Sequence, residues 1–455
     1  MVSSTRMESQ VPRVTKRDVN IATWVCFFAW TFAVYDFVLF GNLLPKLAAE
    51  QGWSSAHSTG INTWVTVGTA LVAFVVGPLA DKLGRRKGII IAVVGAALAS
   101  AVTAAAGPLV GVTAGLGVVV LVLVRSVAGL GYAEQAISAT YLNEMFAHVY
   151  SDPTQARRRG LIYSLVQSGW PVGSVLAPVS IYLLFPIGGW SLCFIVAAFP
   201  AIFMLWAARY LKESPQFAVR HEAENLLAEG RSEEAHTLAN AAGIDLTDRS
   251  TSLASAFKGE SRRSTLVIGS AFLLSWLGVL AFAVLGTSLL TAHDGKNITF
   301  DNALLILIIS NVTAFAGYVF HGWLGDRIGR RNTIAAGWIL SGLAFAGMLL
   351  VPSGSYGAVI ALYSAGLFFL LGPFAALLFF NAESFPVHTR ATGGSIINAA
   401  GQIGAVIGGL LITATLASGH SWTFAAAIWG CLPIFAAGVI ILGARNVDPR
   451  TVRLD

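Results

Sequence analysis

Long apolar stretches alternate with short polar segments along almost the whole chain. A membrane-spanning helix needs about 20 mostly apolar residues, and twelve stretches reach that length. They are residues 19–45, 60–80, 88–107, 117–146, 159–185, 190–210, 264–290, 302–324, 332–351, 357–382, 391–417 and 421–443. The pattern therefore predicts an all-α, polytopic membrane protein with twelve transmembrane helices.

One longer hydrophilic segment, residues 211–263, interrupts this alternation between the sixth and seventh stretches. It is rich in glutamate and arginine, and its alanines and leucines recur at helical spacing. We interpret it as a cytoplasmic connector between two bundles of six helices each, residues 19–210 and 264–443. Short polar tails precede and follow the bundles, at residues 1–18 and 444–455.

The composition agrees with a protein that lies mostly in lipid. Hydrophobic residues make up 55% of the 455 residues and charged residues 11%, with a mean hydropathy of +0.70. A soluble domain carries about 25% charged residues, so this chain has too little charge to cover a water-facing surface or to be disordered. Its three cysteines, Cys26, Cys193 and Cys431, lie far apart in apolar stretches. We therefore expect neither a disulfide framework nor a metal site.

The basic residues are distributed unevenly between the two sides of the predicted membrane. With a cytoplasmic N-terminus, Lys46 and Lys296 are the only ones of the 29 lysines and arginines in outer loops, and Arg125 is the only one deep within a stretch. Cytoplasmic loops of membrane proteins are enriched in lysine and arginine. We therefore expect a monomer in the cell (inner) membrane with both termini in the cytoplasm. The net charge of +6 has this origin, and we expect no nucleic-acid partner.

A loop motif occurs once in each predicted half. The first copy lies between the second and third stretches and the second copy between the eighth and ninth, and both follow the frame Gly-x3-Asp-x2-Gly-Arg-Arg. The copies contribute Gly77, Asp81, Gly84, Arg85 and Arg86, and then Asp326, Gly329, Arg330 and Arg331. Ordinary basic loops account for the arginines but not for the shared frame, so we predict an internal repeat of two halves.

A second set of charges repeats in the same way. Glu144 and Glu383 each lie at the inner end of the fourth stretch of their half. Arginines begin the fifth stretch, Arg158 and Arg159 in the first half and Arg390 in the second. Opposite charges at neighbouring helix ends can form ion pairs that break when two halves rock. We therefore assign both repeated sets a role in conformational gating.

The duplicated loop resembles the signature of the major facilitator superfamily, and the resemblance covers the whole chain. The first half is similar to the metabolite:proton symporters, and within them to the sialate and monocarboxylate branch. The residues that carry this similarity are Tyr35-Asp36-Phe37, Arg125-x3-Gly129-x-Gly131, Ser138-Ala-Thr-Tyr141-x-x-Glu144 and Lys212-Glu213-Ser214-Pro215. The resemblance implies twelve helices, alternating access and the proton-coupled uptake of an organic anion.

Three charged residues remain deep inside the predicted spans: Asp36, Arg125 and Glu134. Each costs roughly 2.5–3.5 kcal/mol to place at the centre of a spanning helix, and such residues mark functional sites by default. From the helical rise, Asp36 and Arg125 both lie about 12–14 Å from the outer face. We expect them to pair. The pair is either a static ion pair or a proton switch, in which Asp36 couples the proton and Arg125 binds a substrate carboxylate.

Glu134 and Arg125 point to opposite sides of an ideal helix, at about 100° per residue. Gly129 and Gly131 lie between them and can bend the helix. Two interpretations of Glu134 stay open: packing and hydrogen bonding within the first half, or proton coupling as a relay. Tyr132 lies on the Arg125 face and extends that candidate site.

Neutral polar and aromatic residues supply the other candidate substrate contacts. Several share a helix face, as Asn398 and Gln402 do at i,i+4 spacing. The alternative for each is hydrogen bonding between packed helices. We select them because the resemblance places spans 1, 4, 7 and 10 around the cavity, with spans 2, 5, 8 and 11 beside them. The candidates are Tyr35, Tyr132, Gln167, Trp276, Asn311, Tyr363, Asn398 and Gln402.

The first functional hypothesis is a proton-coupled importer of a small organic anion, and the single deep arginine favours a monocarboxylate. A drug/proton antiporter of the same fold is the alternative, although residues 169–173 match the Gly-Pro-rich motif of such exporters only in part. A membrane-embedded enzyme or sensor is a remote third, because the chain has no HExxH or GxSxG motif. We expect no catalytic residue, no metal and no cofactor besides the coupling proton.

Overall fold

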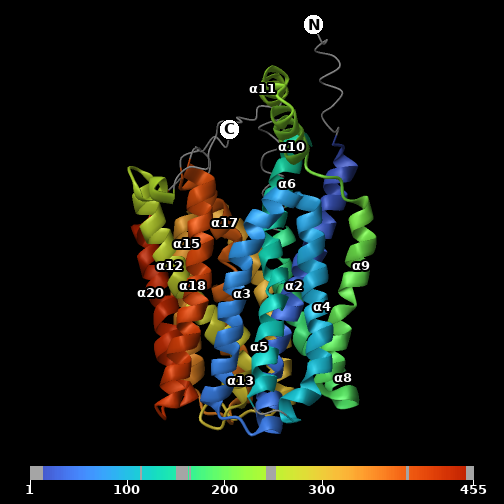
Figure 1. Cartoon of the computed structure of the whole chain (residues 1–455). Helices are drawn as coiled ribbons and strands as arrows, with labels where there is room; N and C mark the ends of the chain where they lie inside the picture. The colour runs from blue at the N-terminus through green and yellow to red at the C-terminus, as the bar shows by residue number, and fades with distance from the viewer. Residues whose placement is uncertain are drawn as a thin grey trace.

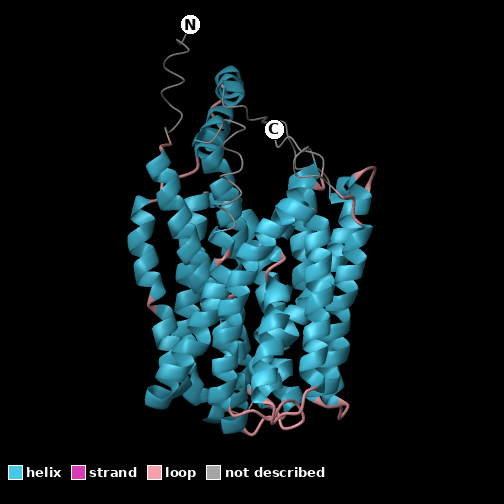
Figure 2. Ribbon diagram, turned by 180° about the vertical axis from the view of Figure 1, so that it is seen from behind, coloured by secondary structure: helices cyan, strands magenta, loops and turns pink. Residues whose placement is uncertain are grey.

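We describe a computed structural model of the chain, which covers residues 14–112, 115–149, 162, 165–241, 253–385 and 389–446 (Figure 1). These residues form helices and the loops that join them, and no strand occurs among them (Figure 2). The long helices stand side by side in one bundle, and helices α10 and α11 lie beyond one of its ends (Figure 1). That end is termed the connector end here, and the opposite one the far end.

Helices of the first half cross the bundle in alternating directions. They are α2 (Lys16–Gln51), α3 (Ser55–Leu83), α4 (Arg85–Val112), α5 (Leu116–Ala128), α6 (Leu130–Val149), α8 (Gly169–Ala198) and α9 (Pro200–Ala207). A capping box begins α2, because the Thr15 hydroxyl accepts from the Asp18 amide and the Asp18 carboxylate accepts from the Thr15 amide. The fourth predicted span is divided at Gly129, between α5 and α6.

Ten segments in the described part of the chain are long and apolar enough to cross a membrane. One of them, Leu165–Tyr210, has 46 residues and turns at Gly188 and Gly189, whose backbone angles are not helical. Gly189 has a φ of 60°, which glycine adopts without strain. This segment makes two crossings, and α5 together with α6 makes one more. The described residues thus form twelve crossings, which is the number predicted from the sequence.

The second half repeats this arrangement with more interruptions. Its helices are α12 (Ser261–Gly278), α13 (Gly286–Thr291), α14 (Phe300–Ile328), α15 (Arg330–Leu350), α16 (Tyr356–Leu371), α17 (Phe374–Glu383), α18 (Arg390–Ala417), α19 (Trp422–Ala426) and α20 (Leu432–Ile440). Two π-helical segments, Val279–Val284 and Ala427–Cys431, continue α12 and α19. The seventh and twelfth spans are therefore composite. The tenth is interrupted at Gly372 and Pro373, because proline cannot donate to the helix ladder.

The predicted connector contains two helices, α10 (Pro215–Ala228) and α11 (Ser232–Ala241). Ser214 caps α10, since its hydroxyl accepts a backbone N–H from the first turn, and Pro215 occupies a favoured first position. The two helices bury a small apolar core of their own, made of Val219, Ala223, Leu226, Ala235, Leu238 and Ala239.

Contacts between the two halves gather at the far end of the bundle. Helix α2 packs against α13, α3 against α18, and α8 against α14. Asn42 Oδ1 accepts a hydrogen bond from Thr287 at 2.9 Å, and the hydroxyls of Thr63 and Thr413 lie 3.2 Å apart. Gly409 faces Thr63 so closely that a side chain there would collide.

Lys46 adds a contact that joins both halves. Its Nζ lies 5.5 Å from the centre of the Phe185 ring and 5.0 Å from that of the Phe300 ring. Phe185 belongs to the first half and Phe300 to the second, and their rings are 6.0 Å apart. An ammonium between two aromatic faces attracts both. These contacts close the bundle at its far end.

Candidate functional site

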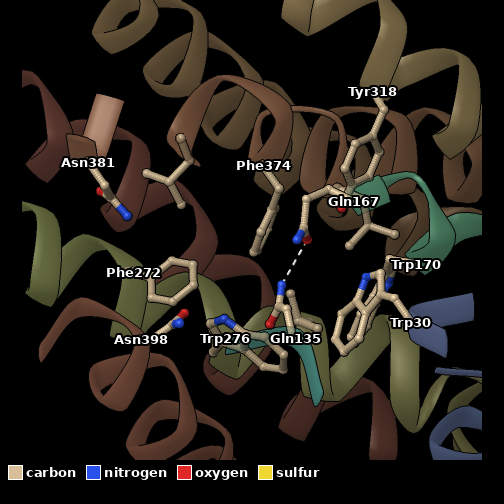
Figure 3. Close-up of a pocket in the computed structure, with 13 residues that line it drawn as sticks. Trp30, Gln135, Gln167, Trp170, Phe272, Trp276, Tyr318, Phe374, Asn381 and Asn398 are labelled. Atoms are coloured by element: carbon tan, nitrogen blue, oxygen red, sulfur yellow. Dashed lines mark hydrogen bonds between the residues drawn. The ribbon is translucent and has the colours of Figure 1, made fainter. Parts of the chain in front are cut away.

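A cavity of about 630 Å³, termed the central cavity, lies between the two halves (Figure 3). Helices of both halves form its wall, including α2, α6 and α8 from the first and α12, α14, α17 and α18 from the second. Its described lining consists of Trp30, Gln135, Gln167, Trp170, Phe272, Trp276, Val279, Tyr318, Leu371, Phe374, Leu377, Asn381 and Asn398.

Three tryptophans form one wall of the central cavity. The rings of Trp30 and Trp170 are 5.9 Å apart, and those of Trp170 and Trp276 are 5.8 Å apart with planes at 87°. Trp170 belongs to the first half and Trp276 to the second, so this edge-to-face contact crosses between the halves. Phe272 and Phe374 continue the aromatic wall around Trp276.

Amide side chains supply most of the polar groups of the central cavity. Gln135 Nε2 donates to Gln167 Oε1 at 2.8 Å (Figure 3). Asn381 and Asn398 line the side that belongs to the second half. No acidic or basic side chain is among the described lining residues. The cavity therefore presents aromatic faces and neutral hydrogen-bonding groups, which suit a flat ring with polar substituents.

A second cavity of about 300 Å³, termed the charged cavity, lies within the first half between α2, α3 and α5. Its described lining consists of Asp36, Phe37, Phe40, Asn62, Val65, Thr66, Thr69, Arg125, Ala128 and Gly129. The described linings of the two cavities have no residue in common.

Asp36 and Arg125 form the predicted ion pair in the charged cavity. Arg125 Nη2 lies 3.1 Å from Asp36 Oδ2, and Nη1 lies 3.2 Å from Oδ1. Ser100 donates to the same carboxylate and accepts from Arg125 at 3.1 Å. The rings of Phe40 and Phe194 lie 5.4 and 5.1 Å from the guanidinium carbon. The pairing is confirmed, and its function stays a prediction.

Predicted substrate contacts that were expected around one cavity are divided between two. Gln167, Trp276 and Asn398 line the central cavity, as predicted, whereas Arg125 lies in the charged cavity. In this conformation Arg125 is not among the described lining residues of the central cavity, and its contact with the substrate stays a prediction. The physical reason is its pairing with Asp36, which holds the guanidinium within the first half.

Tyr363, Asn311 and Tyr35 are not among the described residues that line either cavity. Tyr363 donates to the carbonyl of Phe282 in the π-helical segment. Asn311 Nδ2 donates to a carbonyl one turn earlier in α14, at 2.8 Å. Tyr35 is buried on α2 where that helix packs against α8. Tyr363 and Asn311 therefore fit the alternative interpretation, in which the polar side chain forms hydrogen bonds within the helix bundle. Tyr35 packs within the first half.

Gln402 and Tyr132 complete the predicted substrate contacts. Gln402 lies one turn after Asn398 on α18 but is not among the described lining residues of the central cavity. Tyr132 belongs to α6, and its side chain lies outside the described part of the structure.

Glu134 lies apart from both described cavity linings. It is fully buried, accepts a hydrogen bond from the Ser138 hydroxyl and lies near the Cys26 thiol. Cys26 belongs to an apolar cluster inside the first half. The break at Gly129 therefore does not bring Glu134 to the Arg125 face, and its position favours packing over proton relay.

Sequence reasoning missed Gln135, Asn381, Trp30, Trp170 and Phe374 as lining residues. The two amides carry the signal that selected Gln167, a polar side chain within an apolar span. The aromatic residues carry no such signal, because the chain has 12 tryptophans and 27 phenylalanines and most of them serve packing.

The loop motif of the first half ties together helix ends at the connector end. Arg85 Nη2 lies 3.3 Å from Glu144 Oε1. Glu213 Oε1 accepts from the backbone amides of Arg85 and Arg86, at 2.9 and 3.2 Å. A carboxylate is favourable at this helix N-terminus. Gly84 precedes α4 with a φ of 99°, which explains why glycine stands there.

The motif of the second half repeats these contacts. Arg330 Nη1 lies 2.9 Å from Glu383 Oε1, and Nη2 lies 3.6 Å from Asp326 Oδ1. Arg331 donates to a main-chain carbonyl at the end of the second bundle, at 3.3 Å. Gly329 has a φ of 87°. In each half the first arginine of the motif binds the glutamate of the fourth span, which supports the internal repeat.

These glutamates were expected to pair with arginines at the start of the fifth spans. Their described partners are the loop arginines, which reach the fourth span from the beginning of the third. Arg158 and Arg159 lie outside the described residues, and of Gly77, Asp81 and Arg390 only the backbone is described.

Comparisons with known proteins agree with this architecture. The profile of a family described as "Sugar (and other) transporter" matches residues 21–445. The chain is 24% identical to the niacin transporter NiaP of Acinetobacter baylyi over 94% of each chain. It is 26% identical to the gallate transporter of Pseudomonas putida, over 94% of this chain and 93% of the relative.

Solved structures share the fold. The inward open conformation of the xylose transporter XylE from E. coli matches with a TM-score of 0.68 and 16% identity, covering 95% of this chain and 98% of that one. A partially occluded inward open conformation of the same transporter matches with a TM-score of 0.68 and 18% identity, over 96% of this chain and 100% of that one.

Proposed function

We propose, since the chain belongs to the sugar (and other) transporter family, that it takes up a small organic anion together with a proton. Membership of this family makes the chain a multi-pass membrane transporter and not an enzyme, and its fold is that of the major facilitator superfamily. In transporters built from two such halves, the halves rock around a central binding site. The central cavity lies at this position.

Aromatic monocarboxylates are the proposed substrate class. The observation that carries this proposal is the central cavity itself, in which tryptophan and phenylalanine rings surround a neutral set of amides. A flat ring stacks on these faces, and amide N–H groups donate to a carboxylate. Two relatives are named for niacin and gallate, and both compounds are aromatic rings that bear one carboxylate.

Asp36 and Arg125 are the proposed proton-coupling pair. When the central cavity is open to the outside, a proton binds to Asp36 and cancels its charge. Arg125 is then a buried cation without a counter-ion, which is unfavourable. The substrate carboxylate supplies the missing negative charge, so proton and anion bind together. After the halves rock, release of both allows Asp36 and Arg125 to pair again. The pairing and the closed far end of the present structure support this sequence of states.

The test uses purified protein in proteoliposomes with radiolabelled nicotinate or gallate. We expect accumulation under an inward proton gradient, loss of accumulation on addition of a protonophore, and no accumulation of xylose. Asp36→Asn is expected to keep substrate counterflow and lose proton-driven accumulation. Full proton-driven accumulation by Asp36→Asn would contradict the role of this carboxylate.

The drug/proton antiporter of the same fold remains the alternative. A cationic drug favours a carboxylate in its site, and the described lining of the central cavity contains none. Counterflow with nicotinate against counterflow with a lipophilic cation separates the two functions, and we expect exchange of the anion.

A further inference from the structure

We propose that the contact between Phe37 and Trp170 couples the two cavities, so that a substrate ring in the central cavity promotes protonation of Asp36 in the charged cavity. This inference rests on the proposed function. It explains how two cavities whose described linings share no residue act together. Phe37 is a positioning residue in this scheme, because it acts through the Asp36–Arg125 pair, whereas Trp170 lines the central cavity and contacts the substrate.

Phe37 and Trp170 meet at the boundary between the cavities. Phe37 directly follows Asp36 on α2 and lines the charged cavity, and Trp170 lines the central cavity. Their ring centroids are 6.3 Å apart with planes at 54°. The Trp170 Nε1 is buried and has no hydrogen-bond partner. An unsatisfied buried donor costs about 1–3 kcal/mol, so Trp170 favours a ligand that supplies an acceptor.

Backbone packing at this level leaves α8 little room to move independently of α2. Gly169 and Gly173 flank Trp170, and both face α2. A Cβ atom at Gly173 would lie 2.9 Å from the amide nitrogen of Tyr35, so the two backbones are in close contact. Interiors packed at this density transmit displacements. A substrate that shifts the Trp170 ring therefore displaces Phe37.

The surroundings of Asp36 make its charge sensitive to such a shift. Arg125 of α5 is the cation paired with it, and Ser100 of α4 donates to it. Tyr35 on its own helix and, beside Tyr35, the Cys193 thiol of α8 are further titratable groups in the described surroundings of Asp36. A carboxylate that moves away from Arg125 becomes an uncompensated buried charge. A proton from the aqueous side then binds to its oxygen and neutralises it.

Coupling of this kind is reciprocal. If substrate binding promotes protonation of Asp36, protonation strengthens substrate binding by the same factor. Phe37→Leu keeps an apolar side chain but removes the ring that reaches Trp170. We expect this variant to bind substrate with an affinity that no longer depends on pH, and to exchange substrate without accumulating it.

The experiment titrates purified protein in lipid nanodiscs with nicotinate and, separately, with gallate, from mildly acidic to mildly alkaline pH. Proton uptake per bound substrate is followed in weak buffer, and the same proteins are assayed in proteoliposomes for counterflow and for proton-driven accumulation. Phe37→Tyr retains the ring. Phe32→Leu is the matched control, because Phe32 lies on the same helix and packs against Phe28 and Phe203, away from both described linings.

From mildly acidic to mildly alkaline pH, the affinity for substrate is expected to fall about ten-fold in the wild type, in Phe37→Tyr and in Phe32→Leu. In Phe37→Leu it is expected to fall less than about two-fold. The proposal is overturned if Phe37→Leu keeps its pH dependence and accumulation, or if Phe32→Leu loses them equally.

If Phe37→Leu does not fold, Trp170→Phe replaces it in the experiment. That variant keeps a ring facing Phe37 and is expected to bind more weakly with its pH dependence intact, and loss of the dependence overturns the proposal. A wild-type protein that binds neither compound contradicts the proposed function itself, before any variant is compared.

Discussion

At the scale of single residues, the apolar interior tolerates Asp36 and Arg125 because each satisfies the other. Both carboxylate oxygens accept hydrogen bonds from Arg125, and Nη2 also donates to the Asp36 carbonyl at 3.0 Å. The rings of Phe40 and Phe194 face the guanidinium. Removing one partner of such a pair leaves the other charge buried without compensation.

Arg125→Met is therefore expected to destabilise the protein by about 3–5 kcal/mol. The double variant Asp36→Asn/Arg125→Met is expected to recover most of that loss, because no buried charge remains. Thermal unfolding in detergent, followed by tryptophan fluorescence, measures both. A double variant no more stable than Arg125→Met would show that the two side chains do not compensate each other.

The sequence made the charged residues of the candidate site visible but not its neutral ones. Asp36 and Arg125 are conspicuous because only 11% of the chain is charged and deep charges are costly. Gln135 and Trp170 line the central cavity because of the way their helices are rotated about their own axes, which composition does not indicate. α6 begins after the break at Gly129, so the directions of its side chains do not follow from an ideal helix that contains Arg125.

At the scale of helices, apolar length predicted where the chain spans the bundle but not where the spans are interrupted. A π-helical segment shifts the hydrogen-bond pattern by one residue, and it depends on local partners. The Tyr363 hydroxyl, for example, donates to the Phe282 carbonyl within such a segment. Hydropathy does not record this kind of partner, whereas Pro373 in the tenth span is visible in the sequence.

Lys46 is expected to hold α2, α8 and α14 together at the far end. Lys46→Met removes cation–aromatic contacts worth about 1–2 kcal/mol, which shifts the equilibrium toward opening at the far end by roughly five- to thirty-fold. A cysteine introduced at Thr63, with the three native cysteines replaced by alanine, reports this opening through its labelling rate with an impermeant maleimide.

Glu50→Gln is the control for this measurement. It removes the charge of a side chain that accepts from Trp190 Nε1 at the same end, within the first half, and the labelling rate is expected to stay at the parent value. Equal labelling rates for Lys46→Met and the parent would show that Lys46 does not hold the far end closed.

At the scale of the whole molecule, the repeated loops predicted two halves, but not which end of the bundle is closed. The same sequence adopts both the outward-open and the inward-open state of a rocking transporter, and the conditions shift the populations of the two states. The present state is identified only by contacts between distant segments, such as the one between Thr63 and Thr413.

The double variant Thr63→Cys/Thr413→Cys is expected to form a disulfide on mild oxidation, because the native hydroxyls already lie 3.2 Å apart. The cross-link holds the far end closed, so transport is expected to stop and to return after reduction. Each single cysteine variant is the control. Transport that persists after complete cross-linking would contradict alternating closure at this end.

The charge content of the two cavities has an electrical consequence. Among their described lining residues, Asp36 is the single acid and Arg125 the single base. One proton and one monovalent anion then cross together without net charge, and the empty protein returns with its ion pair neutral. A membrane potential, which does about 2.3 kcal/mol of work per charge per 100 mV, has no charge to move. Accumulation is therefore expected to follow the pH difference alone, at about ten-fold per pH unit, and to be unchanged by an imposed potassium diffusion potential.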